Sequence, residues 1–479
     1  MKKKSLFLVL LLFVLTQKDF AQDTVSYSGT FSLKQCVEMA LKNNIDVNRS
    51  DLLMQDSKVS LSNARGNRLP FVSGDITHTL SQGRAIDPFT NGYVNQNLSS
   101  ANYSLGASLN LWNAGSINNY IKSSKLNYQA SQMDLQQQKD NITINVILAY
   151  LQVLNNEEQL NAIMQQADVT RKQVERLEIL NKDGAIAPST YYDTKGQLAS
   201  DEISIVNQKN ALETSKVDLA ALMNIFYSKD MALEKMNIPG ELVLYDGTSQ
   251  QIYQQALQNL ALVKAANLRQ QSATTTVKSA KGQMYPSLVL NGGLGTNYSN
   301  AASTSSLIGV TDVPTDNYVL VNNEKISVYS PQSNYAQNKI SYGDQWKNNF
   351  NSYVSIGISI PILNGFQARN RVTTAKIDEK RTSIEAKTTK TQLQQVVEQA
   401  YINMNSSYEK YLKLATQVED FGESFRAAEI KFNAGVLTSV DYFLIKGSYD
   451  RSNINLIAAK YDYMLRTKIL DFYQGKLSL

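Results

Sequence analysis

The sequence is poor in the side chains from which enzymes and metalloproteins build their sites. Its 479 residues include one cysteine, Cys36, and one histidine, His78. A lone cysteine cannot form a disulfide within the chain, and these two residues are too few for a His/Cys zinc site or for a hydrolase that needs a second histidine or cysteine. The phosphate-loop pattern G-x-x-x-x-G-K-[ST] is also absent. The composition therefore argues against an enzyme, a bound cofactor and a metal site.

Charge is scarce as well. Charged residues make up 19% of the chain, below the ~25% of a typical soluble domain. The formal net charge is +5, and the first 21 residues contribute four lysines and one aspartate, which leaves 5 − 3 = +2 for the remainder. Because the basicity belongs mostly to the N-terminal segment, we expect no nucleic-acid partner.

The N-terminal segment is organised like a secretory signal peptide. Three lysines, Lys2 to Lys4, precede an unbroken apolar run from Leu6 to Leu15. That run is too short to span a bilayer. We expect cleavage after Ala21 or Gln22, which would remove residues 1–21; an uncleaved anchor helix is the alternative.

The rest of the chain is an internal duplication. Ala64-Arg65-Gly66 matches Ala280-Lys281-Gly282 at an offset of 280 − 64 = 216 residues. Farther along, Gly184 matches Gly435 at an offset of 435 − 184 = 251. The second copy therefore carries 251 − 216 = 35 additional residues, which lie between about 291 and 356. Their richness in Ser, Asn, Thr and Tyr predicts a long polar loop over residues 299–348.

Two repeats and a linker follow from this duplication. Each repeat should contain a helix, a β-hairpin, a very long helix, a turn and a further helix. Residues 226–247, interrupted by Ile238-Pro239-Gly240, are the expected linker or equatorial region. The expected ranges are 22–225 for the first repeat, with hairpin 69–113, long helix 114–180 and helix 188–225, and 248–479 for the second, with hairpin 285–363, long helix 365–432 and helix 440–475.

Hydrophobic residues at seven-residue spacing predict the long helices. Val397, Met404 and Tyr411 begin one such series, and no proline interrupts 116–180 or 366–432. At 1.5 Å per residue each of these segments would reach ~100 Å. Sustained heptads favour helices packed as coiled coils. The helices alone would suit a coiled-coil rod.

Four segments with strict alternation of apolar and small polar residues argue against a simple rod. Alternation over ~10 residues is typical of a transmembrane strand with lipid on one side and a wet lumen on the other. Four strands cannot close a barrel, and open edges are costly in lipid, so several chains must combine; three would give twelve strands and a lumen. The residues expected to face lipid are Leu105, Leu109, Leu288, Leu290, Ile356, Ile358 and Ile360.

The order of these features resembles the TolC family of outer-membrane efflux proteins, over essentially the whole chain after the signal segment. The resemblance implies an α+β membrane protein, a homotrimer with a twelve-stranded β-barrel, four strands per chain, continued by a long α-helical coiled-coil periplasmic barrel. The segments that carry it are Phe31-Ser32-Leu33, Ala40-Leu41-Lys42-Asn43-Asn44, Leu69-Pro70, Tyr285-Pro286, Leu363-Asn364-Gly365, Asp183-Gly184-Ala185-Ile186 and Ala434-Gly435-Val436-Leu437-Thr438.

The resemblance also implies a function. The chain would be the outer-membrane exit duct of a tripartite efflux or type I secretion system in a Gram-negative bacterium, with a large periplasmic portion. Its partners would be outer-membrane lipid, a periplasmic adaptor (membrane fusion) protein and an inner-membrane RND or ABC-type pump, with neither enzymatic activity nor cofactor. The residues alone leave one alternative, a coiled-coil structural or adhesive surface protein, and they do not indicate the cargo.

Family members dock adaptor hairpins at their glycine turns and place acidic side chains just past them. Asp441 is the matching acid in the second copy, with Leu444 where another aspartate can stand. In the first copy Thr190 replaces the equivalent acid, and Asp193 lies one turn later. Both acids could instead simply favour a helix N-terminus. The docking residues carried over from the family are Gly184, Ala185, Ile186, Gly435, Val436 and Leu437.

Overall fold

The computed structural model describes residues 29–86, 91–95, 97–236 and 242–476, so the expected signal peptide lies outside the described residues. The chain divides into two compact units, and each unit contains segments from both halves of the sequence. The helical unit comprises the described residues of the segments Met1–Ser57, Asn127–Gln270 and Thr382–Leu479, and the strand unit comprises those of Lys58–Leu126 and Gln271–Arg381.

Eight helices form four pairs of equal length. Their first residues differ by 249 − 33 = 216 in the first two pairs and by 439 − 188 = 251 in the last two, the same offsets that relate the copies in the sequence. The pairs are α2 (Leu33–Asn43) with α6 (Ser249–Asn259), 11 residues each; α3 (Ile45–Gly66) with α7 (Ala261–Gly282), 22 each; α4 (Ser116–Lys182) with α9 (Gln367–Asn433), 67 each; and α5 (Pro188–Met223) with α10 (Ser439–Gln474), 36 each.

The first helix of each copy, expected as one element, is two. Asn44 separates α2 from α3, and Leu260 separates α6 from α7, each with an extended backbone (ψ 129° and 132°). An extended residue ends the helical hydrogen-bond ladder, so the chain starts a new helix after it. Neither residue is a proline or a glycine, so the sequence carries no strong signal for a break at these positions.

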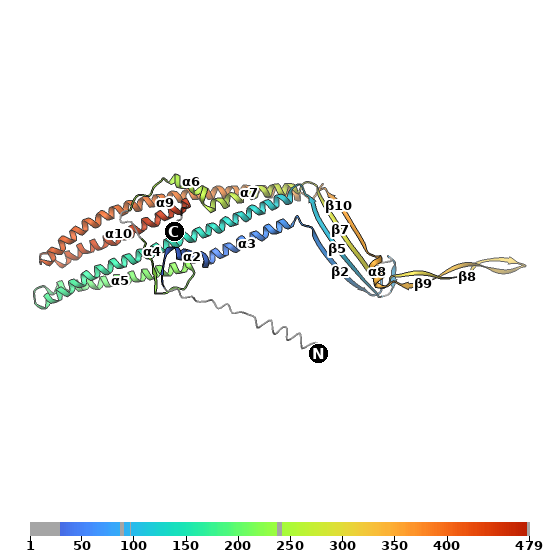
Figure 1. Cartoon of the computed structure of the whole chain (residues 1–479), viewed down its shortest axis with the longest axis horizontal. Coiled ribbons are helices and arrows are strands. Elements are labelled where there is room, and N and C mark those ends of the chain that lie inside the picture. Colours follow the sequence, from blue (N-terminus) through green and yellow to red (C-terminus); the bar gives the residue numbers. More distant parts are fainter. Residues whose placement is uncertain (1–28, 87–90, 96, 237–241, 477–479) are drawn as a thin grey trace, which may run out of the picture. The chain divides into compact units, whose positions relative to one another are not determined.

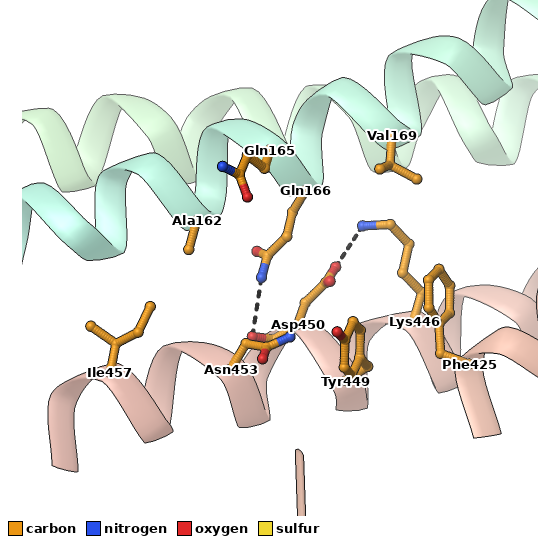
Figure 2. Close-up of a pocket in the computed structure, with 10 residues that line it drawn as sticks. All are labelled: Ala162, Gln165, Gln166, Val169, Phe425, Lys446, Tyr449, Asp450, Asn453 and Ile457. Atoms are coloured by element: carbon orange, nitrogen blue, oxygen red, sulfur yellow. Dashed lines mark hydrogen bonds and ion pairs between the residues drawn. The ribbon is translucent and has the colours of Figure 1, made fainter. Parts of the chain in front are cut away.

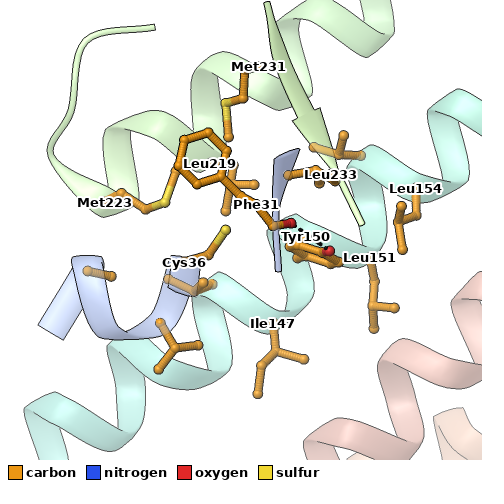
Figure 3. Close-up of a cluster of buried hydrophobic side chains, with 14 of the residues drawn as sticks. Phe31, Cys36, Ile147, Tyr150, Leu151, Leu154, Leu219, Met223, Met231 and Leu233 are labelled. Atoms are coloured by element: carbon orange, nitrogen blue, oxygen red, sulfur yellow. Dashed lines mark hydrogen bonds between the residues drawn. The ribbon is translucent and has the colours of Figure 1, made fainter. Parts of the chain in front are cut away.

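A compact core of the helical unit surrounds Tyr150 of α4 (Figure 3). Here β1 (Gly29–Phe31) pairs in parallel with β6 (Met231–Leu233), so the expected linker contributes a strand. The Tyr150 hydroxyl donates to the carbonyl oxygen of Glu234 (2.6 Å) and lies 3.1 Å from that of Phe31. Cys36 is fully buried beside them, and burial raises the pKa of its thiol to about 12. The only cysteine is thus a core residue rather than a reactive thiol.

The strand unit is built on a four-stranded antiparallel sheet (Figure 1). Its order is β10–β7–β5–β2, so the two expected hairpins lie side by side through β5 and β7. A short hairpin of β3 (Arg84–Ile86) and β4 (Tyr93–Asn95) lies in the connection between β2 and β5. The strands of the sheet are β2 (Phe71–Ser81), β5 (Leu98–Trp112), β7 (Ser287–Ser299) and β10 (Asn351–Ser359).

The expected polar loop over 299–348 contains regular secondary structure that the sequence pattern did not predict. β8 (Ser303–Val321) and β9 (Glu324–Lys339) form an antiparallel two-stranded ribbon, followed by α8 (Tyr342–Asn348). Asn322 and Asn323 join the strands with φ of 51° and 68°, the conformation of a two-residue hairpin turn, for which asparagine is well suited. The Asn-Asn pair was the available signal, but the many polar residues of the exposed strands made the segment look like a loop.

Candidate functional site

The register of the sheet places apolar side chains of neighbouring strands on one face. Residues paired across antiparallel strands point to the same side. The sets of paired apolar residues are Leu109–Leu290–Ile356, Leu288–Ile358 and Leu105–Leu294. Six of the seven residues expected to face lipid are therefore on one face, and the seventh, Ile360, follows the last residue of β10.

The opposite face of the sheet carries mostly small and polar residues, with Phe71, Val289 and Tyr353 as the larger apolar or aromatic exceptions. Ser108 pairs with Asn291, which pairs with Ser355, and one row toward β2 joins Ser73 to Gly106. Such side chains can contact water without a desolvation cost. The sheet therefore has one face suited to lipid and one suited to an aqueous lumen.

Aromatic rings lie at both ends of the apolar face, which the sequence analysis missed. At one end the ring of Tyr103 lies 4.9 Å from that of Trp346, and the ring of Tyr298 lies 5.1 Å from that of Tyr342. At the other end Trp112 closes β5 and is 52% exposed. The signal was available, because the two tryptophans of the sequence are these two residues.

The distance between the aromatic ends matches a membrane. Tyr103 and Trp112 are 112 − 103 = 9 residues apart on one strand, which corresponds to ~30 Å. The hydrocarbon core of a bilayer is ~30 Å thick, and barrel strands cross an apolar band of ~25 Å at a tilt. On this scale Leu109 lies well inside the band. Ile358 lies near one end of it, because Ile358 and Trp112 both pair with Leu288.

The sheet has an edge on each side. Among the described strands, β2 is paired in this sheet with β5 alone and β10 with β7 alone. Their outer edges present backbone N–H and C=O groups, and each such group left unsatisfied in lipid costs several kcal/mol. A sheet with this apolar face therefore needs further strands at both edges.

Glycine turns join the long helices of the helical unit. Gly184, between α4 and α5, has φ 69°, and Gly435, between α9 and α10, has φ 72°. The next amide reaches back in both turns: Ala185 N donates to Leu180 O (2.8 Å), and Val436 N donates to Lys431 O (2.9 Å). This left-handed glycine cap ends an α-helix. Both glycines are thus required by helix termination, whatever else binds there.

The other four expected docking residues differ in exposure. Ile186 and Leu437 are partly buried against one hydrophobic cluster. Both helical hairpins, α4–α5 and α9–α10, contribute to this cluster. Ala185 and Val436 are exposed, and Val436 is 76% exposed. The buried members of this cluster are Leu177, Ala428, Phe432 and Tyr442. Of these four residues, Ala185 and Val436 are therefore the ones whose side chains a partner could reach.

The two expected entrance acids both contact hydroxyls at the start of α10. Asp441 accepts a hydrogen bond from the Thr438 hydroxyl (2.7 Å), and its own amide donates to Thr438 Oγ1 (3.1 Å). Asp193 accepts a hydrogen bond from the Ser439 hydroxyl (3.0 Å), which links the two hairpins. Asp441 thus completes a helix N-cap. Both carboxylates remain exposed.

A buried ion cluster lies farther along the same helices (Figure 2). The side chain of Lys446 is 3% exposed, and its ammonium lies 2.5 Å from Asp450 Oδ2 and 3.9 Å from Asp201 Oδ2. Burial raises the pKa of Asp450, and Asp201 raises it further although Lys446 opposes the shift. The cluster borders a cavity of about 320 Å³ that Gln166 of α4 also lines. The sequence pattern gave no sign of it, because the three charged residues come from two separate helices.

The described residues do not assemble a metal site. No group of three or more His, Cys, Asp or Glu side chains among them is placed to hold a metal ion. None of the helices in this part of the chain has a stretch long and apolar enough to cross a membrane.

The fold is similar to solved structures of bacterial outer-membrane channels. It matches the CmeC outer membrane channel of Campylobacter jejuni with a TM-score of 0.73 at 16% identity, over 93% of this chain and 85% of that one. VceC of Vibrio cholerae gives 0.72 at 14% identity over 92% and 96%. The open state of the Neisseria gonorrhoeae MtrE channel gives 0.68 at 16% identity over 93% and 88%. At these identities the likeness concerns the fold alone.

Comparison by sequence identifies a family. A search of curated proteins gives no match. The family model described as outer membrane efflux protein matches residues 36–224 and 252–475, which is most of the chain and includes both copies of the duplication. The chain belongs to the outer membrane efflux protein family.

Proposed function

We propose that three copies of this chain close their sheets into one twelve-stranded β-barrel that continues into a helical tunnel. The family serves as the outer-membrane exit duct of efflux systems and is not a family of enzymes. The observation that supports the trimer is the four-stranded sheet with an edge on each side. Pairing β2 of one copy with β10 of the next would satisfy both edges. Two copies would give eight strands with a filled interior, whereas three leave a lumen.

In this barrel the apolar face contacts lipid and the polar face lines the duct. The aromatic rings at both ends of the apolar face support this orientation, because aromatic girdles mark the two interfaces of membrane barrels. At a strand tilt of about 40° the ~30 Å from Tyr103 to Trp112 spans ~23 Å across the membrane, close to the expected band.

Cross-linking between sheet edges tests the closed trimer. Cysteines replace Ser73 on β2 and Ser355 on β10 in a Cys36→Ala background, and purified protein reacts with a flexible bis-maleimide. Covalent dimers and trimers, and nothing larger, are expected on denaturing gels, because a closed ring of three has three such seams. A ladder that continues past three, or no intermolecular product at all, would overturn the closed trimer.

The matched control places its two cysteines on the same face of the sheet, but on two strands that are already paired with each other inside the chain. Ser108 and Asn291 are paired across β5 and β7. Cysteines at these two positions should cross-link only within the chain. Intermolecular bands from this control would mean that the cross-links arise from random collisions between protein molecules rather than from paired sheet edges.

The two repeats, 22–225 and 248–479, joined by 226–247, would then place their glycine turns at the periplasmic tip. We assign this tip to a periplasmic adaptor that connects the duct to an inner-membrane RND or ABC-type pump. A photo-crosslinking residue in place of the exposed Val436 should capture the adaptor in cells. The same residue in place of Ile402, exposed on α9, should not. Equal capture from both positions would remove the assignment.

Asp441, with Asp193 as the weaker contributor, is assigned to the entrance of the duct. Threefold symmetry would bring three copies of Asp441 toward one axis, where carboxylates attract cations. Asp441→Asn removes the charge and keeps an acceptor for the Thr438 hydroxyl, which separates entrance charge from helix capping. Lower cation selectivity in planar bilayers is expected for Asp441→Asn, and a smaller change for Asp193→Asn. Unchanged selectivity for Asp441→Asn would leave it a capping residue only.

A further inference from the structure

Charge of one sign surrounds the Trp112 end of the sheet, where α3 and α7 end and α4 and α9 begin. The residues near this end, 58–74, 108–126, 272–291 and 359–377, include no Asp or Glu. We define the basic collar as the Lys and Arg residues within six positions of these helix ends, ~9 Å along a helix. All are exposed: Arg65, Arg68, Lys122, Lys278, Lys281, Arg369 and Arg371.

Helix chemistry accounts for only part of the basic collar. Arg65 and Lys281 lie in the last turns of α3 and α7, where a positive charge is favoured by the helix dipole. Arg369 and Arg371 lie in the first turns of α9, where the dipole disfavours them and an acidic residue is usual. No acidic residue is present in the first turn of α9 or of α4. Another source of negative charge is therefore expected at the Trp112 end of the sheet.

A cavity of about 450 Å³ opens beside the basic collar. Arg68 and Trp112 both line it, together with the amide side chains of Asn113 and Asn118. The Arg68 guanidinium is held there, because its Nε and Nη2 donate to Asn118 Oδ1 (3.1 and 2.5 Å). A fixed guanidinium, amide groups and an indole ring suit a group that is anionic at one end and enters from an apolar layer.

We propose that the basic collar binds the anionic phosphate head groups of the adjacent phospholipid leaflet, one of them in the Arg68–Trp112 cavity. The inference rests on the proposed function, which places the sheet in the membrane and Trp112 at its boundary. The collar residues nearest the helix ends then lie close enough to that boundary for their charges to be only partly screened. Each Lys or Arg near an anionic lipid surface contributes about fivefold in affinity.

Lipid binding to purified full-length protein tests the proposal. Delipidated protein in detergent receives phosphatidylglycerol and phosphatidylcholine with the same acyl chains, and native mass spectrometry counts both on each oligomer. The parent should prefer phosphatidylglycerol. The triple variant Arg68→Gln, Arg369→Gln, Arg371→Gln should lose at least about tenfold of that preference. Equal preference in parent and variant would overturn the collar.

Two control variants separate charge from folding and from position. Lysines at the same three positions retain the charge and should keep most of the preference. Lys410→Gln with Lys413→Gln removes two exposed charges farther along α9 and should change nothing. A loss with the lysine variant, or an equal loss with the α9 control, would mean that the head groups are not bound at the collar.

Two further outcomes show whether the bound anion is a lipid or free phosphate, and whether the collar or the proposed barrel is wrong. If millimolar inorganic phosphate displaces phosphatidylglycerol, the collar is a site for free anions rather than for lipid. The same spectra report subunit number. A trimer without lipid preference would reject this inference alone, whereas lipid preference on a protein that never forms trimers would reject the proposed barrel and keep the collar.

Discussion

Equivalent residues of the two copies have different surroundings. Lys446 corresponds to Lys195 at the offset of 251 (446 − 195), yet Lys446 is buried against Asp450 whereas Lys195 is exposed near the ring of Tyr191. Ala199 stands in the first copy where Asp450 stands in the second. A buried lysine needs a counter-charge, so the copy that supplies Asp450 can bury its lysine between the hairpins.

Asp450 should make stability depend on pH in an identifiable direction. Its pKa is raised in the folded state, so folded protein binds its proton more tightly than unfolded protein does. That contribution is fully present below the unfolded pKa and declines as pH rises through the folded pKa. Between neutral pH and about pH 4 the urea midpoint of the parent should therefore rise relative to that of Asp450→Asn. A parent that loses stability relative to the variant on acidification would contradict the buried position of this carboxyl group.

The two faces of β5 should respond oppositely to charge. Leu109→Arg would place a cation well inside the lipid band and should cost ~2–4 kcal/mol of assembly free energy. Ile358→Arg, near the end of the band, should cost less, and Ser108→Arg on the polar face should be tolerated. Trimer yield on native gels from outer-membrane fractions measures this order. Equal sensitivity at Leu109 and Ser108 would contradict the proposed orientation of the sheet.

Among the elements, the glycines of the long helices have two distinct roles. Gly184 is in the left-handed conformation that ends α4. Gly196 lies inside α5, and an added Cβ there would meet no heavy atom within 4 Å. A side chain is strained in the first conformation and favourable in the second, because glycine in a helix interior has a large conformational entropy to lose.

Alanine at these two positions should have opposite effects. Gly184→Ala should destabilise the protein by about 1 kcal/mol, because its φ suits glycine. Gly196→Ala should stabilise it by up to ~1 kcal/mol. Thermal or urea unfolding followed by far-UV circular dichroism provides the measurement. Stabilisation by both variants would mean that the turn at 184 does not keep its left-handed glycine.

For the whole molecule, the family assignment decides between the two functions that the residues left open. The chain is an outer-membrane efflux duct with a periplasmic portion, and a coiled-coil adhesive protein is set aside because the family match includes both long helical hairpins. The β8–β9 ribbon is an insertion of the second copy, so the duct should not depend on it.

Removal of the ribbon should leave the assembly intact. Ile340 N donates to Ala302 O (3.0 Å) at its base, so Ser303–Lys339 can be replaced by Asn-Gly, which suits a two-residue hairpin turn. Loop length has little effect on closure free energy, and trimer formation in native mass spectra should be unchanged. In whole cells, added protease should cut the parent within the ribbon and spare residues 181–188. Loss of the trimer, or cleavage of 181–188 with the ribbon protected, would contradict the proposed topology.

Local periodicity determined much of the architecture from the sequence alone. The ends of α4, α5, α9 and α10 lie within two residues of the expected bounds. Heptad spacing and glycine caps depend only on residues that are close together in the sequence, so they can be recognised without the fold. The apolar and polar faces of the strands follow from a period of two for the same reason. Even the offsets of the duplication, 216 and 251, reappear as differences between helix starts.

Contacts between distant segments required the tertiary structure. The pairing of β5 with β7, the aromatic ends of the apolar face and the burial of Lys446 each join segments far apart in sequence. Tertiary contacts also gave Asp193 its link to Ser439, and they decided which of the expected docking residues are exposed. A local pattern specifies which way a side chain points along its own strand or helix, but its partner depends on which other element packs there, and only the folded chain brings those elements together.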